Sequence, residues 1–213
     1  MKRRSLIFIL LMFFLPACGG GNDPPENKGR DSNAARPRPD APGESSREYG
    51  TRTGKTILVT ETHPVGRSLS TIEVASRGFG HNRPERYEDR DPISDVFVAD
   101  LDGNGFDEIY IITTSQGSGS YGSVLGFASN RDRSLSTIHF PEMEEGDSLF
   151  EGYMGHDVFT VEGQKLLRTF PVYNAGDRNS SPTGGRRKLV YGLYPGEAVW
   201  QLKIERSEPL MQP

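Results

Sequence analysis

Short runs of β-branched and aromatic residues, separated by clusters of Gly, Asn, Asp and Pro, fill the chain from residue 55 onward. This pattern is typical of β-strands joined by turns, and a helical period is nearly absent. We therefore expect an all-β fold, a single antiparallel β-sandwich or barrel-like domain of about eight to ten strands. The candidate strands are 56–61, 69–76, 95–99, 108–114, 123–129, 135–140, 157–161, 166–172, 188–193 and 198–204.

Two of the connections between these runs are short. Residues 161–165 (VEGQK) and 194–197 (YPGE) each separate two candidate strands, so they predict antiparallel hairpins. The chain has one cysteine, Cys18, which lies ahead of all the strands. The β domain can therefore form no internal disulfide, and packing alone must stabilise it.

The segment before the first strand has a different composition. Residues 19 to about 54 are rich in Gly, Pro, Asn, Asp, Ser and Arg and hold few large apolar residues. Such a segment cannot bury enough surface to order itself. We expect a disordered linker at 18–53, a β domain at 54–206 and a C-terminal tail at 207–213.

The N-terminus resembles a bacterial lipoprotein signal. Basic residues at 2–4 precede an apolar run at 6–15, which is shorter than the roughly 20 residues that a membrane-spanning helix needs. The run ends in Leu-Pro-Ala-Cys at 15–18, which looks like a lipobox. We expect a signal peptide at 1–17, cleavage before Cys18 and lipid on that cysteine, which would anchor the chain to a membrane.

Two further features bear on location and partners. Gly19 stands where an aspartate would retain a lipoprotein in the inner membrane, so the signal predicts an exported chain on the outer membrane that faces the periplasm. The net charge is −4, and removal of the basic signal peptide would make it more negative. An acidic chain of this kind is not expected to bind nucleic acid.

One acidic turn is a candidate metal site. Asp100, Asp102, Asn104 and Glu108 alternate around Gly103 in the segment DLDGNGFDE, and oxygen ligands in such an arrangement suit calcium. The segment is not an EF-hand, but it is similar to the calcium loops of integrin-type propeller repeats, which occur in series. The alternative is a hairpin turn whose Asp and Asn side chains cap backbone amides.

A glycine-serine loop with one aromatic ring lies between two candidate strands. Residues 114–123 read TSQGSGSYGS, and Tyr121 is the ring. Such a loop is either a flexible connection or a binding loop, because a stiff tyrosine gives contact area at little entropic cost.

From about residue 56 to 204 the chain resembles the bacterial periplasmic inhibitors of invertebrate-type lysozyme, a family of small antiparallel β proteins. The resemblance lies in DVFVADLDG, the Ser-Gly-x-Tyr element, GYMGHD, FPVY, and PTGG followed by KLVY, at 95–103, 118–121, 152–157, 170–173, 182–185 and 188–191.

The resemblance implies that Ser118 and Tyr121 are the inhibitory serine and tyrosine, with Gly119 between them, and that the partner is an invertebrate-type lysozyme. A lysozyme depends on two carboxyl groups in a cleft, so a loop that offers hydroxyl donors there would block it. The implied role requires no cofactor and no catalysis by this chain. The alternatives are a calcium-dependent cell-surface binding module that uses the segment 100–108, and a periplasmic glycan-active enzyme.

Overall fold

The computed structural model describes residues 43–144 and 146–210, which fall within one unit, Arg36–Pro213. In these ranges the chain forms twelve strands and one 3₁₀ turn. They are β1 (Gly43–Gly50), β2 (Thr56–His63), β3 (Ser70–Arg77), β4 (Glu85–Arg90), β5 (Ile93–Ala99), β6 (Glu108–Thr114), β7 (Gly122–Ser129), β8 (Leu135–His139), η1 (Ser148–Phe150), β9 (Val158–Glu162), β10 (Lys165–Pro171), β11 (Arg186–Pro195) and β12 (Trp200–Leu210).

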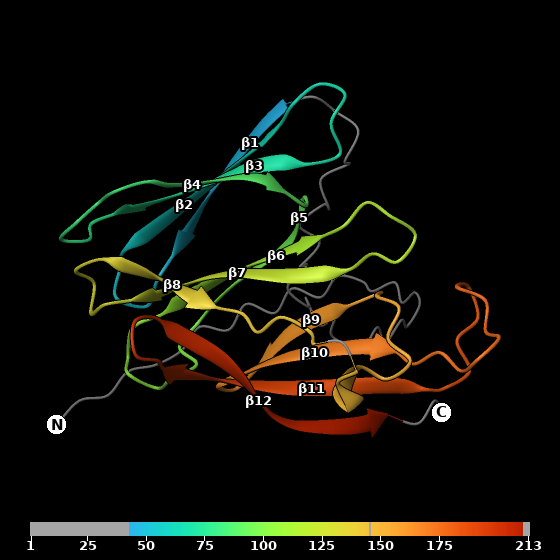
Figure 1. The fold of residues 1–213 in the computed structure, drawn as a ribbon. Helices are drawn as coiled ribbons and strands as arrows, with labels where there is room; N and C mark the ends of the chain where they lie inside the picture. The colour runs from blue at the N-terminus through green and yellow to red at the C-terminus, as the bar shows by residue number, and fades with distance from the viewer. Residues whose placement is uncertain (1–42, 145, 211–213) are drawn as a thin grey trace, which may run out of the picture. The chain divides into compact units, whose positions relative to one another are not determined.

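The first sheet has four antiparallel strands in the order β1-β2-β3-β4 (Figure 1). In β2 and β3 buried and less buried residues alternate, as expected of strands with one face on a core. The buried face carries four aliphatic side chains, which pack against β6 and β7 of the second sheet. They are Ile57, Val59, Ile72 and Val74.

The second sheet has eight strands in the order β5-β6-β7-β8-β12-β11-β10-β9. Its strand β6 is buried on both faces: Ile109 and Ile111 face the first sheet, and Tyr110 and Ile112 face a second core that includes side chains from β10, β11 and β12. A strand buried on both faces reads as a continuous apolar run, and β6 has such a sequence, EIYIITT.

Nearly all strand pairs join neighbours along the chain and are antiparallel. The exception among the described strands is the pairing of β8 with β12, which is parallel and joins Trp200 to Ile138 and Gln201 to His139. This pairing connects the β5–β8 half of the second sheet to the β9–β12 half (Figure 1).

The all-β prediction is confirmed, and each of the ten predicted strands corresponds to a strand of the structure. Two further strands, β1 and β4, and the parallel pair were not predicted. β1 lies in the predicted linker 18–53, so that linker was drawn too far toward the C-terminus. The predicted tail 207–213 was also wrong in part, because β12 continues through Leu210.

Both predicted hairpins are present. Gly163 and Gln164 form the turn between β9 and β10, and residues 196–199 connect β11 to β12. The predicted signal peptide, Cys18 and the first part of the predicted linker lie outside the described residues. Within the described ranges no helix has the length and apolar character to cross a membrane.

Candidate functional site

The loop that carries Tyr121 extends the β6–β7 hairpin beyond its last pair, Thr114 with Gly122. It is closed by hydrogen bonds: the amide of Ser115 donates to the carbonyl of Tyr121 (2.9 Å), and the amide of Tyr121 donates to Ser115 Oγ (2.8 Å). At its tip the Ser120 amide donates to the carbonyl of Gly117, three positions earlier in the turn (3.0 Å). The loop therefore has a defined conformation.

A second segment, residues 152–157, supports the loop from the side. The amide of His156 donates to the carbonyl of Gly119 (2.5 Å). Gly155 lies in the left-handed region (φ +88°), and a Cβ atom there would overlap the Gly119 carbonyl oxygen. The close approach of the two backbones therefore requires glycine at position 155.

A third segment contributes Asn179. Its Nδ2 donates to the carbonyl of Ser118 (2.8 Å), and its Oδ1 lies 3.1 Å from Nε2 of His156. Two chain segments that are far from the loop in sequence thus hold its backbone at Ser118 and Gly119.

The side chains of the loop are free at the surface. Ser118 is exposed, and Tyr121 is 47% exposed. The Tyr121 ring lies against Gly119 and packs edge-on against Tyr153, with ring centroids 5.7 Å apart. Neither the Ser118 hydroxyl nor the Tyr121 hydroxyl makes a hydrogen bond within the described part of the chain, so both can bind a partner.

A buried ion pair anchors the base of this site. Arg168 Nε donates to Asp157 Oδ1 (2.7 Å), and the two side chains are 2% and 0% exposed. Asp157 Oδ2 accepts hydrogen bonds from the Gly122 amide (2.7 Å) and from the Tyr153 hydroxyl. This carboxylate therefore fixes both the end of the loop and the ring that supports Tyr121.

The guanidinium of Arg168 remains charged in an aromatic environment. Burial acts to lower the pKa of Arg168, but hydrogen bonding to Asp157 and its charge raise it above the usual value. Burial also raises the pKa of Tyr153, which stays a neutral hydroxyl donor. Five rings surround the guanidinium at 5.0–5.9 Å: Phe140, Phe150, Tyr153, Phe159 and Phe170.

Sequence analysis did not identify Asp157 and Arg168 as part of the site. The available signal was an arginine inside an apolar strand, KLLRTFP, since an arginine is almost never fully buried unless it is paired. The partner could not be found in the same way, because Asp157 lies at a strand end where acidic residues are common.

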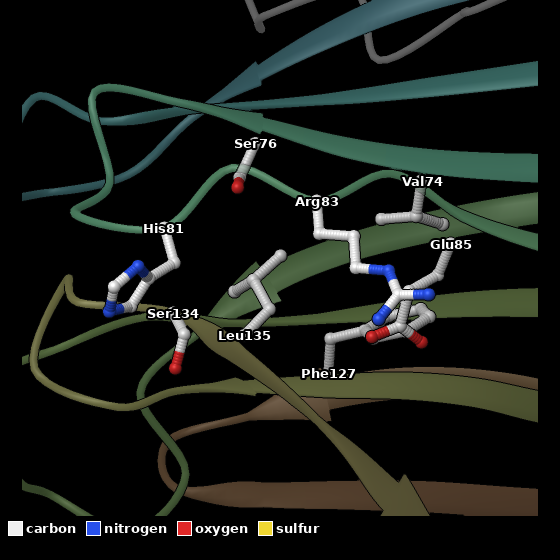
Figure 2. A pocket seen from close by; sticks show the side chains of 8 residues that line it. All are labelled: Val74, Ser76, His81, Arg83, Glu85, Phe127, Ser134 and Leu135. Atoms are coloured by element: carbon white, nitrogen blue, oxygen red, sulfur yellow. The ribbon is translucent and has the colours of Figure 1, made fainter.

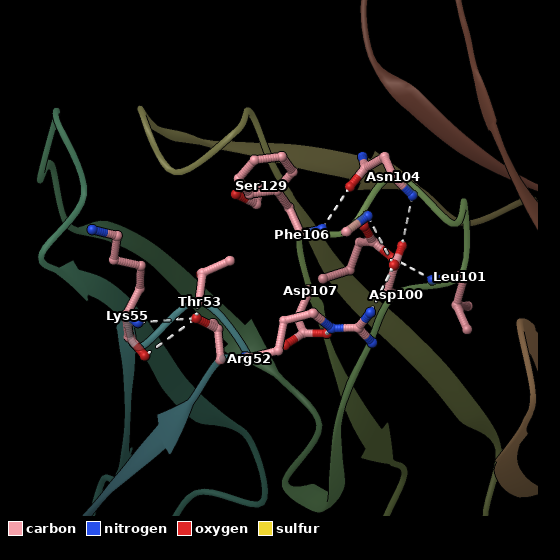
Figure 3. A network of polar contacts seen from close by, with 12 residues as sticks. Arg52, Thr53, Lys55, Asp100, Leu101, Asn104, Phe106, Asp107 and Ser129 are labelled. Atoms are coloured by element: carbon pink, nitrogen blue, oxygen red, sulfur yellow. Dashed lines mark hydrogen bonds and ion pairs between the residues drawn. The ribbon is translucent and has the colours of Figure 1, made fainter.

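The acidic turn forms a separate group. Carboxylate oxygens of Asp100, Asp102 and Glu108 lie within 4.8 Å of one another. The structure therefore brings together three of the four predicted metal ligands. The fourth, Asn104, is in the same turn, where its Oδ1 accepts a hydrogen bond from the amide of Phe106 (2.8 Å; Figure 3).

The amide-capping alternative is also present in this turn. Asp100 Oδ1 accepts from the Asn104 amide (3.0 Å), and Oδ2 accepts from the Gly105 amide (2.9 Å). Arg52, in the turn between β1 and β2, reaches across to this segment and donates to Asp107 (2.7 Å) and to Asp100 (3.0 Å; Figure 3). The turn is thus joined to the first sheet by ion pairs.

Glu108 is the most deeply buried carboxyl of the group, at 0% exposed. Its Oε2 accepts from the Leu101 amide (2.7 Å) and the Tyr110 hydroxyl (3.3 Å), whereas Oε1 is buried without a hydrogen-bond partner among the described residues. Burial, followed by the charges of Asp102 and Asp100, raises the pKa of Glu108 to about 8.

Two surface hollows lie near these elements. One, of about 290 Å³, opens beside Asp102 and Asn104 and is lined also by Trp200, Arg131 and Arg133. The other, of about 180 Å³, lies between the first sheet and strands β7 and β8. Figure 2 shows His81 at one end of the second hollow and Arg83 with Glu85 at the other. No predicted site residue lines the second hollow.

No known family model matches this chain, and neither a curated protein nor a solved structure matches it.

Proposed function

We propose that the chain is a lipid-anchored inhibitor of invertebrate-type lysozyme, which inserts the loop 115–121 into the active-site cleft of that enzyme. The observation that carries this proposal is a pair of exposed hydroxyl groups, on Ser118 and Tyr121, that bind nothing within the described chain and project from a loop with a fixed backbone.

The geometry of the loop suits an inhibitor. A loop that is already ordered loses little conformational entropy when it binds, so more of the contact energy appears as affinity. A half-exposed tyrosine is a common anchor at the centre of protein interfaces. The two hydroxyl groups can donate to the two carboxyl groups on which lysozyme catalysis depends.

The proposal includes the location of the chain. Lipid on Cys18 would hold the protein on the outer membrane, facing the periplasm, where it would protect peptidoglycan. In this role the chain performs no reaction of its own and requires no cofactor.

The test is a titration of an invertebrate-type lysozyme with the full chain, beside a chicken-type lysozyme as a second target. We expect stoichiometric inhibition of the invertebrate-type enzyme. We expect Ser118→Ala and Tyr121→Ala each to weaken inhibition at least about tenfold, which corresponds to about 1.4 kcal/mol.

Matched controls lie elsewhere on the surface. Ser68→Ala changes an exposed serine in the β2–β3 turn, and Tyr194→Ala changes a tyrosine of β11 that is 40% exposed. Both should inhibit as the wild type does. Full inhibition by a Ser118→Ala/Tyr121→Ala double variant would contradict the loop mechanism, and absence of inhibition by the wild-type chain would contradict the function itself.

A calcium-dependent cell-surface binding module is the second candidate, and the carboxyl group cluster of Asp100, Asp102 and Glu108 favours it. That function predicts ligand binding that is lost in a chelator and unaffected by Tyr121→Ala. The two candidates are therefore separated by the same set of variants.

A further inference from the structure

The unpaired oxygen of Glu108 needs an explanation. A buried carboxylate oxygen that loses its water and gains no donor is costly, and nearly all buried polar atoms in native proteins have a partner. Glu108 is 0% exposed, and its Oε1 has no hydrogen-bond partner in the described chain. Among the described residues, then, no side chain supplies this oxygen with a donor or a positive charge.

The carboxyl groups around Glu108 add further negative charge that needs a positive partner. Asp100 and Asp102 each place a carboxylate oxygen within 4.8 Å of one on Glu108, and Asp107 is close by. Of the cations that the structure describes, Arg52 contacts this group, and it pairs with Asp100 and Asp107. A single guanidinium thus faces several partly or fully buried carboxyl groups, and none of its hydrogen bonds goes to Glu108.

We propose that Asp100, Asp102 and Glu108 bind one divalent cation, and that this cation is calcium. The three groups offer only oxygen atoms as ligands. Such a set suits hard cations such as calcium and magnesium better than it suits zinc or copper. Calcium tolerates irregular coordination and completes its shell with water or backbone carbonyls, whereas magnesium requires near-octahedral geometry.

A hollow of about 290 Å³ adjoins the site on the side of Asp102. It is lined by Asp102 and Asn104, so water ligands can occupy it, and Trp200 lies on its wall. Arg131 and Arg133 line the same hollow and repel a cation. The affinity should therefore be in the weak range of extracellular calcium modules, a dissociation constant of about 0.1–1 mM.

The site has a structural role that is independent of lysozyme inhibition. It lies where Arg52 of the β1–β2 turn meets the turn between β5 and β6. A bound ion would neutralise the excess negative charge at this junction and hold the β5–β6 turn in place. Calcium should accordingly raise the unfolding temperature of the chain.

The probe for binding is terbium, a luminescent substitute for calcium that is sensitised by nearby aromatic rings. Trp200, the single tryptophan of the chain, lines the hollow, and the Tyr110 hydroxyl contacts Glu108. Titration of the chelator-treated full chain should give saturable terbium emission under tryptophan excitation. Calcium should displace the signal, and magnesium should require at least about tenfold more.

Variants test the assignment of the ligands. Glu108→Gln and the partly exposed Asp102→Asn should each weaken calcium binding at least tenfold and remove the calcium-dependent rise in unfolding temperature. Asp95→Asn, an exposed change on β5 of the same hairpin, should leave both unchanged. Circular dichroism establishes that each variant is folded. Absence of saturable binding to the folded wild type, or undiminished binding to both ligand variants, would overturn the proposal.

Discussion

At the scale of single residues, the candidate site depends on a glycine, Gly155, because the position has no room for a side chain. Gly155 has a positive φ, and its α-carbon faces the Gly119 carbonyl at a distance that leaves no room for Cβ. The Gly/Ser-rich sequence of 114–123 indicates a loop but carries no information about this contact, because the partner glycine lies more than thirty residues further along the chain. The family resemblance nominates Ser118 and Tyr121 as candidate residues, whereas the contact that fixes the backbone beside them is visible only in the structure.

Gly155→Ala should destabilise the protein by at least about 1–2 kcal/mol, the cost of left-handed backbone for a residue with a Cβ, and should also shift the loop. Urea unfolding measures the first effect, and the titration of lysozyme measures the second as weaker inhibition. Gly50→Ala is the control, since a Cβ at position 50 meets no atom within 4 Å and φ there is not positive. Equal stability of the two variants would contradict the contact.

The pKa of Glu108 gives a pH dependence whose sign can be worked out. Because the folded-state pKa of about 8 lies above that of an exposed glutamate, the native state binds the proton more tightly than the unfolded state. In a chelator, stability should be highest near pH 5 and should fall by at least about 1.4 kcal/mol, one pKa unit, as the pH rises toward 8.

The measurement is urea unfolding in a chelator at pH 5, 6, 7 and 8. Glu108→Gln should be less dependent on pH over this range, because it removes the titrating carboxyl. A wild-type protein whose stability rises between pH 5 and pH 8 would show that Glu108 is ionised in the native state without a cation.

At the scale of elements, the buried pair of Arg168 and Asp157 joins β10 to the segment that supports the loop. Asp157→Asn leaves a buried guanidinium without its counter-charge, so we expect a loss of about 3–5 kcal/mol in the free energy of unfolding. Arg206→Ala removes an exposed pair with Glu208 and should cost at most about 1 kcal/mol. Chemical denaturation of both variants measures the difference, and a small effect of Asp157→Asn would mean that the pair does not hold the site.

The strands that could be predicted from sequence differ in burial from those that could not. β6 and β11 have apolar runs that their burial requires, so their sequences are sufficient. β1 and β4, with the sequences GESSREYG and ERYEDR, are exposed edge strands whose conformation comes from pairing with β2 and β3. Their local sequences resemble linkers and turns, since an edge strand has little apolar surface to bury.

At the scale of the whole molecule, the folded domain includes β1 and so begins earlier in the chain than the sequence indicates. A chain of residues 54–213 lacks β1 and leaves β2 as an unpaired edge. We expect it to unfold at a temperature at least about 4 °C lower than a chain of residues 36–213, and to self-associate through the exposed edge. Thermal unfolding and light scattering measure the two effects, and identical behaviour of both chains would show that β1 adds nothing to the fold.

The order of the strands along the chain bears on the order in which the strand pairs form during folding. The segments 43–90, 93–139 and 158–210 each contain strands that pair with their neighbours along the chain, so each can form from local contacts. Proteins rich in contacts between residues close in sequence fold faster than proteins dominated by contacts between distant residues. The parallel pairing of β8 with β12 is the late exception, since its two residue pairs lie about sixty residues apart along the chain. Assembly should therefore end with the pairing of β8 and β12, and until then the folding chain exposes the unpaired edges of both strands.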